Sequence, residues 1–304
     1  MAIKLRSYNF KKDYERVGKF LLNNYKIQTA IPFNWCQPRW EYMHFHPYMD
    51  ERDLYDVLNK IGIWEDKGKI VGVVHFEDEL GQAYFEYSPD YLFLKKEMLD
   101  YALQNLGKEL ESGRKFIKVF VNEFDKEFEE LVKKEKFTKD SKSSEINSSM
   151  KISLKKLKYS LPKRFNIQSL ADENDLTKLH RILHRGFNHQ GEPLPEGIEG
   201  RKKMQSAPNY NKSLNIVAVE PKNGNYVSIC GSWYDSVNNF VYIEPVATNP
   251  DYRFLGLGKA VVLEAIKRNY EIGATLALVG SFQDFYKAIG FKYYFTNNCW
   301  VKYF

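Results

Sequence analysis

Alternating and helical patterns of apolar residues occur in the same order twice along the chain. In the first half, an amphipathic helix pattern over residues 13–24 precedes a series of short strands and turns over residues 63–91. In the second half, a helix pattern over residues 172–185 precedes a similar series over residues 217–252. Both series end in Pro-Asp-Tyr and continue to a helix and another strand. The pattern therefore predicts two copies of one α/β domain.

A polar connector divides the two copies. The run DSKSSEINSS leads into a short alternating stretch ending at Leu154, which predicts the closing strand of the first domain. Pro162 then interrupts the chain. We expect a first domain over residues 1–154, a linker over residues 155–164 and a second domain over residues 165–304.

Composition and charge narrow the class of protein. With 304 residues, 43% hydrophobic and 28% charged, the chain is globular and long enough for two domains. Its net charge is +6, but residues 1–154 hold 25 Lys and Arg against 26 Asp and Glu, and residues 165–304 hold 15 against 13. The five bases and no acids of the linker supply most of the excess. Because neither domain is strongly basic, we expect no nucleic-acid partner.

Targeting signals and paired cysteines are missing from the sequence. No apolar run approaches the roughly 18 to 20 residues that span a bilayer, and the first residues, MAIKLRSYNFKKDYERV, lack an apolar signal segment. The three cysteines, Cys36, Cys230 and Cys299, are widely spaced, which is typical of buried free thiols. We therefore expect a cytoplasmic protein without membrane partner, and the oligomeric state stays open.

The clearest chemical signal follows the second Pro-Asp-Tyr. In NPDYRFLGLGKAVVLEA, a strand is followed by Arg253, Gly256 and Gly258 at R-x-x-G-x-G spacing, and an apolar-periodic helix begins there. Glycines let the backbone approach a ligand, and the free amides of a helix N-terminus attract anions. The spacing differs from a Walker A loop, and the dinucleotide fingerprint fails at Val261. The motif predicts a site for a pyrophosphate.

This motif resembles the one with which GCN5-related N-acetyltransferases bind the pyrophosphate of acetyl-CoA. Further along, SFQDFYKAIGF resembles the Tyr-x-x-x-Gly-Phe pattern that closes the acyl-CoA site of that family, here at Tyr286, Gly290 and Phe291. The chain ends in two aromatic stretches, FKYYF and CWVKYF, where the family has its last hairpin. The sequence departs from the family at one point, because the Asn often found before the Tyr motif is absent.

The resemblance implies a fold, a donor and a set of contacts. The fold class is α/β (α+β), with two tandem acetyltransferase-like domains, each a mixed, mostly antiparallel sheet flanked by helices. The acyl donor is acetyl-CoA, and no metal is implied. The expected cofactor contacts lie at the end of one strand, in the glycine loop and before the Tyr motif: Val246, Ala247, Thr248, Arg253, Phe254, Leu255, Gly256, Leu257, Gly258, Lys259 and Ser281.

The first half lacks every diagnostic residue of this motif. Alignment on Pro-Asp-Tyr places Lys95 and Glu97 at the positions of the two glycines, and alignment on the later phenylalanines places Val132 at the position of Tyr286. A Glu side chain in the loop would repel a pyrophosphate. We predict a degenerate first domain that supports the fold or shapes the substrate cleft.

Acetyl transfer to an amine needs a base and a stabilised leaving group. An alkylamine has a pKa near ~10, so presenting it unprotonated at pH 7 costs about 4 kcal/mol. Glu244, on the strand before the cofactor loop, is our candidate base, and Tyr242 shares its face and is a candidate substrate contact. Tyr286 is implied as the residue that assists thiolate departure. The alternatives are a turn cap or ion pair for Glu244 and simple packing for Tyr286.

Three histidines in the second domain invite a metal hypothesis. His180 and His184 share a helix face, but no Glu stands between them, arginines crowd the same turns, and no clear third ligand follows. We expect no metal site. The segment RGFNHQGE instead predicts a loop over the acceptor cleft, with Phe187, Asn188 and His189 as substrate contacts.

These features together predict direct transfer of an acetyl group from acetyl-CoA to an amine on a small molecule or peptide. Two alternatives stay open. One is an acyl-CoA sensor without turnover, and the other is an aminoacyl-tRNA-dependent transferase of the Fem type. The intact glycine loop and the charge distribution argue against the second alternative.

Overall fold

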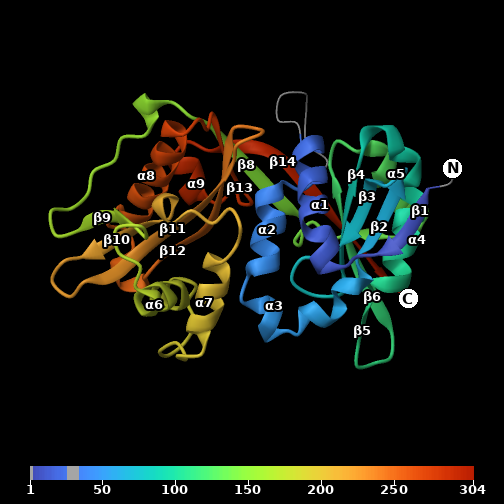
Figure 1. Ribbon diagram of the computed structural model, residues 1–304, viewed down its shortest axis with the longest axis horizontal. Coiled ribbons are helices and arrows are strands. Elements are labelled where there is room, and N and C mark those ends of the chain that lie inside the picture. Colours follow the sequence, from blue (N-terminus) through green and yellow to red (C-terminus); the bar gives the residue numbers. More distant parts are fainter. Residues whose placement is uncertain (1–2, 26–33) are drawn as a thin grey trace. The chain divides into compact units, whose positions relative to one another are not determined.

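The computed structural model describes residues 3–25 and 34–304 (Figure 1). Two units emerge, each with its own core: unit 1 is formed by Met1–His44, Tyr48–Asn147 and Tyr294–Phe304, and unit 2 by Phe45–Pro47 and Ser148–Tyr293. Each unit is a mixed, mostly antiparallel sheet with helices, which confirms the predicted fold class. Within the described ranges, no helix is long and apolar enough to cross a membrane.

Unit 1 is built on a sheet in which β4 and β6 pair in parallel. The strand order is β1 (Lys4–Ser7), β2 (Gly62–Asp66), β3 (Lys69–His75), β4 (Gln82–Tyr87), β6 (Lys115–Asn122) and β14 (Lys292–Tyr303). Two short strands pair at the side, β5 (Lys108–Glu109) with β6 and β7 (Thr138–Lys139) with β14. The helices are α1 (Phe10–Asn24), α2 (Gln37–Phe45), α3 (Tyr48–Glu51), α4 (Lys95–Asn105) and α5 (Lys126–Lys134).

Unit 2 repeats this plan, with β12 and β13 as its parallel pair. The order is β8 (Glu145–Lys151), β13 (Leu276–Val279), β12 (Phe240–Thr248), β11 (Asn225–Asp235), β10 (Ile216–Glu220) and β9 (Asn166–Ser169). The first three residues of β8, up to Asn147, group with unit 1. Its helices are α6 (Leu176–Gly186), α7 (Gly197–Gln205), α8 (Leu257–Glu271) and α9 (Asp284–Ala288).

Helices α8 and α6 cover opposite faces of the unit 2 sheet. Ile216 and Ala218 of β10 pack in the apolar cluster that contains α8, whereas Val217 and Val219 pack in the cluster that contains α6. This alternation follows from the two-residue period of a strand. Both faces are buried, so the strand is continuously apolar.

The C-terminal residues differ from the sequence prediction. Two short strands joined as a hairpin were expected, but residues 292–303 form one strand, β14. The expectation followed the last hairpin of the family, and it was wrong because the residues between the two aromatic stretches continue the strand. In the structure Thr296 N donates to Glu123 Oε1, and buried Asn298 donates to Glu129, so these polar groups are satisfied inside a strand.

The predicted domain boundaries also differ from the two units. Residues 294–304 group with unit 1, where β14 pairs with β6, and residues 148–151 group with unit 2, where β8 pairs with β13. The predicted linker is not a free tether either. Leu157 is buried in the unit 2 core, and the Tyr159 hydroxyl donates to Glu264 at 3.0 Å.

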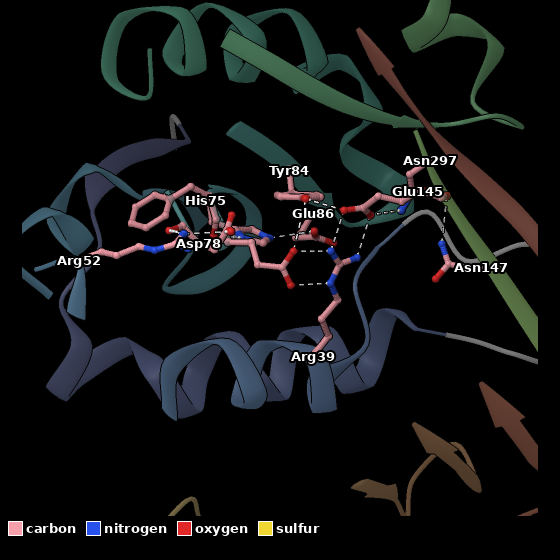
Figure 2. A network of polar contacts seen from close by, with 11 residues as sticks. Arg39, Arg52, His75, Asp78, Tyr84, Glu86, Glu145, Asn147 and Asn297 are labelled. Carbon is pink, nitrogen blue, oxygen red and sulfur yellow. Dashed lines mark hydrogen bonds and ion pairs between the residues drawn. The ribbon is translucent and has the colours of Figure 1, made fainter. Parts of the chain in front are cut away.

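A charged cluster lies within unit 1 (Figure 2). The Arg39 guanidinium donates to both oxygens of Glu77 and of Glu145, and the Tyr84 hydroxyl donates to Glu145 at 2.7 Å. The same guanidinium lies 3.9 Å from the ring of Trp35. All three guanidinium nitrogens of Arg39 are engaged, so the cluster ties α2 to the sheet.

His44 is a fully buried histidine held in its neutral form. Its Nδ1 lies 2.9 Å from Trp40 O, and its Nε2 lies 3.0 Å from the Tyr8 hydroxyl. A carbonyl can only accept, so Nδ1 carries the proton and Nε2 accepts from Tyr8. Burial lowers the pKa of His44 to about 3.

The stability of the protein should therefore fall as the pH falls from about 6.5 towards 3. In this window the unfolded chain binds a proton at His44 that the folded chain does not, which costs up to about 1.4 kcal/mol per pH unit. Urea unfolding at pH 7.5 and at pH 5 measures the effect. His44→Gln should reduce the pH dependence; equal pH dependence in wild type and His44→Gln would contradict the assignment.

Candidate active site

An opening in the unit 2 sheet holds a cavity of about 820 Å³. Strands β12 and β13 pair in parallel at three positions, the last being Tyr242 opposite Leu278. Beyond that pair the cavity separates them, lined by Ile243, Glu244 and residues 246–248 on one side and by residues 279–281 on the other. A cavity of this size accommodates an extended small molecule.

The glycine loop forms one wall of the cavity. Gly256 is the N-cap of α8, with φ of +80°, and no side chain caps this helix. By contrast, Asp175 caps α6 by accepting from the amides of Thr177 and Lys178. The first amides of α8 are therefore available to a ligand, and the helix dipole favours an anion there.

The two glycines of the loop are needed for different reasons. A Cβ on Gly256 would meet nothing within 4 Å, so this residue supplies the left-handed conformation and faces open space. A Cβ on Gly258 would lie 3.1 Å from Thr248 Oγ1 and 3.3 Å from the ring of Phe285. Gly258 therefore permits close packing, and together the glycines leave the cradle open.

Tyr286 and Glu244 line the same cavity. Tyr286 lies in α9, where its ring packs edge-on against Phe285 and Phe291, with centroids 5.0 and 5.6 Å away. Burial raises the pKa of Tyr286 above its ordinary value, and Cys230 and Glu244 raise it further. Its hydroxyl therefore stays protonated at neutral pH and can donate a hydrogen bond.

Half-buried Glu244 sits at an irregularity in β12. The pairing of β11 with β12 shifts between Cys230 and Ser232, and a Cβ on Gly231 would collide with Glu244 O. The Glu244 carbonyl also accepts from Trp233 Nε1 at 3.0 Å. Gly231 thus permits the bulge that places Glu244 at the cavity. Gly231 was not predicted as a site residue, although a glycine inside a strand is a recognised signal of a bulge.

Comparisons with known proteins find matches in structure but not in sequence. No protein-family model matches this sequence, and no curated protein matches it. Solved structures do match over nearly the whole chain. A GCN5-related N-acetyltransferase from Sphaerobacter thermophilus superposes with a TM-score of 0.61 at 11% identity, covering 99% of this chain and 95% of the other. A tandem GNAT protein from the clavulanic acid biosynthesis pathway gives a TM-score of 0.64 at 11% identity, covering 99% and 98%.

The chain has the GCN5-related N-acetyltransferase fold. A third match is a GCN5-related glucosamine N-acetyltransferase region of a fungal multi-domain β-N-acetylglucosaminidase, with a TM-score of 0.57 and 16% identity. It covers 99% of this chain and 38% of that one. These matches confirm the resemblance at the level of the fold.

Within this acetyltransferase fold, the predicted cofactor contacts gather at one place. Of the eleven predicted residues, all except Leu255 line the cavity. Arg253 is turned in an unexpected direction, because its guanidinium donates to Thr248 O, Gly186 O and Asn188 Oδ1. It ties the glycine loop to the end of α6, and its contact with a pyrophosphate stays a prediction.

The predicted substrate contacts are divided by the structure. Phe187 and Asn188 line the cavity, whereas His189 and Tyr242 do not. The His189 ring lies beside the His184 ring in a tilted arrangement, and buried Tyr242 directs its hydroxyl towards Gly280. The roles of these four residues stay predictions.

Other cavity residues were not identified from the sequence. Gly186 lies so close to β12 that a Cβ would be 2.6 Å from Ala247 Cβ, and Val279, Gln283 and Ile289 also line the cavity. The side chains of His180 and His184 contact the carbonyls of Leu194 and Gln190. Among residues 3–25 and 34–304, no three His, Cys, Asp or Glu side chains are grouped to hold a metal ion.

In unit 1, buried side chains fill the position that corresponds to the cavity of unit 2. Strands β4 and β6 pair in parallel only at Gln82 with Lys118 and Ala83 with Val119. Close to the start of α4, the Lys95 ammonium lies 2.8 Å from Asp125 Oδ1, and the Tyr87 hydroxyl donates to the other oxygen of Asp125. All three side chains are buried.

The turn after α5 in unit 1 reproduces the turn after α9 in unit 2. Phe137 N donates to Val132 O as Phe291 N donates to Tyr286 O, both at 3.0 Å. Lys136 and Gly290, at corresponding positions of the two turns, both have a positive φ, +64° and +107°. The backbone correspondence supports the duplication, while Val132 supplies no hydroxyl.

Proposed function

We propose that unit 2 binds acetyl-CoA and transfers its acetyl group directly to an amine on a small molecule or peptide. The observation that carries the proposal is a single cavity that combines an uncapped, glycine-lined helix N-terminus with Tyr286 and Glu244. The acetyltransferase fold of the matched structures supports it. The alternative function, a sensor of acyl-CoA, uses the same cavity to bind acyl-CoA but transfers no acyl group.

The cofactor is held by backbone groups. The amides of residues 256–259 bind the pyrophosphate, helped by the dipole of α8 and by Lys259. The pantetheine arm follows the free edge of β12 at residues 246–248, where a backbone amide donates to the thioester carbonyl. Glycines at positions 256 and 258 keep this path open.

Glu244 acts as the base of the reaction. The amine nitrogen forms a bond to the thioester carbon, its proton passes to the Glu244 carboxylate directly or through a water, and the carbon–sulfur bond breaks to release the CoA thiolate. Phe187 and Asn188, which line the cavity, contact the amine. The thiolate finally takes up a proton from solvent or from Glu244.

Tyr286 stabilises the departing sulfur. Because burial raises the pKa of Tyr286, giving its proton to a thiolate is unfavourable, and its hydroxyl instead donates a hydrogen bond as charge develops. Packing against Phe285 and Phe291 fixes the ring in place.

A screen of amine acceptors for thiol release from acetyl-CoA tests the proposed function. Small metabolites, aminoglycosides, peptides and lysine-containing proteins form the panel. Thiol release with at least one class supports transfer. Tight binding of acetyl-CoA without release from any acceptor would favour the sensor, and no binding at all would overturn both.

Tyr286→Phe should lower kcat by about 10- to 100-fold, the effect of one lost hydrogen bond in the transition state. The phenyl ring is kept, so the affinity for acetyl-CoA should change little. Steady-state kinetics with an acceptor from the panel, together with an acetyl-CoA titration, separate the two effects. An unchanged kcat would remove Tyr286 from the mechanism.

A further inference from the structure

A fully exposed aromatic side chain lies at the edge of the unit 2 cavity. Phe254 is 104% exposed, although it lines the cavity and belongs to the glycine loop. Its backbone adopts φ of +63°, in the left-handed region that disfavours bulky residues. The Phe254 ring adds nothing to the core, and the Phe254 backbone is strained. Residues with strained backbones cluster at active sites and ligand-binding sites.

The exposure of three aromatic residues gives the cavity an inner and an outer end. Tyr286 is 8% exposed, Phe285 beside Gly258 is 37% exposed, and Phe254 is 104% exposed. All three line the cavity. A ligand that places its thioester at Tyr286 and its pyrophosphate on the amides beyond Gly256 must therefore direct its remaining part outward, past Phe254.

We propose that Phe254 stacks on the adenine of coenzyme A and so selects an adenine-bearing acyl donor over one that ends at phosphopantetheine. This inference rests on the proposed function, because it names a further contact of the same donor. A flat ring without a hydrogen-bonding group suits the π face of a purine. The acyl chain and the amine are excluded as occupants because they belong at the inner end, near Tyr286.

Calorimetric titration of the full chain with two donors tests this selection. Acetyl-CoA carries the adenine, and acetyl-4′-phosphopantetheine does not. Phe254→Leu keeps an apolar side chain but removes the flat ring, so the Kd for acetyl-CoA should rise by about 5- to 150-fold, the range that one stacked base contributes. The Kd for acetyl-4′-phosphopantetheine should stay within about twofold, because that donor makes no such contact.

Two further variants serve as controls. Phe254→Tyr keeps the ring and should bind acetyl-CoA like the wild type. Phe254→Gly relieves the left-handed strain, so its Tm should not fall although its acetyl-CoA affinity does. Equal acetyl-CoA affinity in Phe254→Leu and wild type, or an equal loss for both donors, would overturn this inference alone. A wild type that binds neither donor would overturn the proposed function with it.

Discussion

Gly256→Glu should abolish acetyl-CoA binding, with a rise in Kd of at least about 100-fold. The substitution forces a side chain onto a residue with φ of +80° and places a carboxylate beside the amides that are proposed to hold a pyrophosphate. Because a Cβ at this position meets nothing within 4 Å, the variant should still fold. Calorimetric titration of the folded variant measures the loss.

Gly113→Glu is the matched control for this variant. Gly113 has φ of +78°, and a Cβ there also meets nothing within 4 Å, but it belongs to unit 1 and does not line the cavity. The same substitution thus introduces the same charge and similar backbone strain. The Gly113→Glu variant should bind acetyl-CoA like the wild type. Equal affinities for Gly256→Glu and wild type would remove the glycine loop from the cofactor site.

Glu244→Gln should lower kcat/KM by about 100-fold or more near pH 7, the contribution typical of a general base. The rate should recover in part at high pH, where the amine loses its proton without help. A pH profile of wild type and variant, with an acceptor from the screen, measures both effects. Loss of rate by the same factor at every pH would indicate a structural role instead.

Glu271→Gln provides the comparison for this profile. Glu271 is exposed near the end of α8 and does not line the cavity, so the variant should follow the wild type at every pH. If Glu244→Gln also follows the wild type, Glu244 is not the base. The acetyl-CoA affinity of both variants shows whether any loss arises in binding or in chemistry.

Much of the fold was predictable because it rests on local, periodic signals. The repeated series of strands ending in Pro-Asp-Tyr predicted the duplication, and the turns at Lys136 and Gly290 share a positive φ and an equivalent backbone hydrogen bond. The glycine loop was predictable because its residues adjoin in sequence. Ten of the eleven predicted cofactor contacts, which lie in this loop, at the end of β12 and at Ser281, line one cavity.

Other features depend on contacts between distant residues. Nothing local to residues 292–303 shows that they pair with β6, and Glu123 and Glu129, the partners of Thr296 and Asn298, lie far back in the sequence. Gly231 inside a strand pattern signals a bulge, but only the pairing of β11 with β12 shows that Glu244 is the residue it positions. The direction of the Arg253 side chain likewise depends on the end of α6.

Each unit contains strand residues from outside its predicted domain boundaries, and this has a practical consequence for experiments. A fragment beginning at residue 160 lacks residues 148–151, which pair with β13, and unit 1 without residues 294–304 lacks the strand that pairs with β6. Each fragment would expose an unpaired strand edge. Tests of either unit are therefore best made in the full chain, with point variants.

The stoichiometry of acetyl-CoA binding to the full-length wild type tests the central claim, that unit 2 carries the donor site and unit 1 does not. The filled position at Lys95, Asp125 and Tyr87 in unit 1 leads us to expect one site per chain in a calorimetric titration. The single site should disappear in Gly256→Glu. Two sites per chain, or one site that survives in Gly256→Glu, would contradict the account.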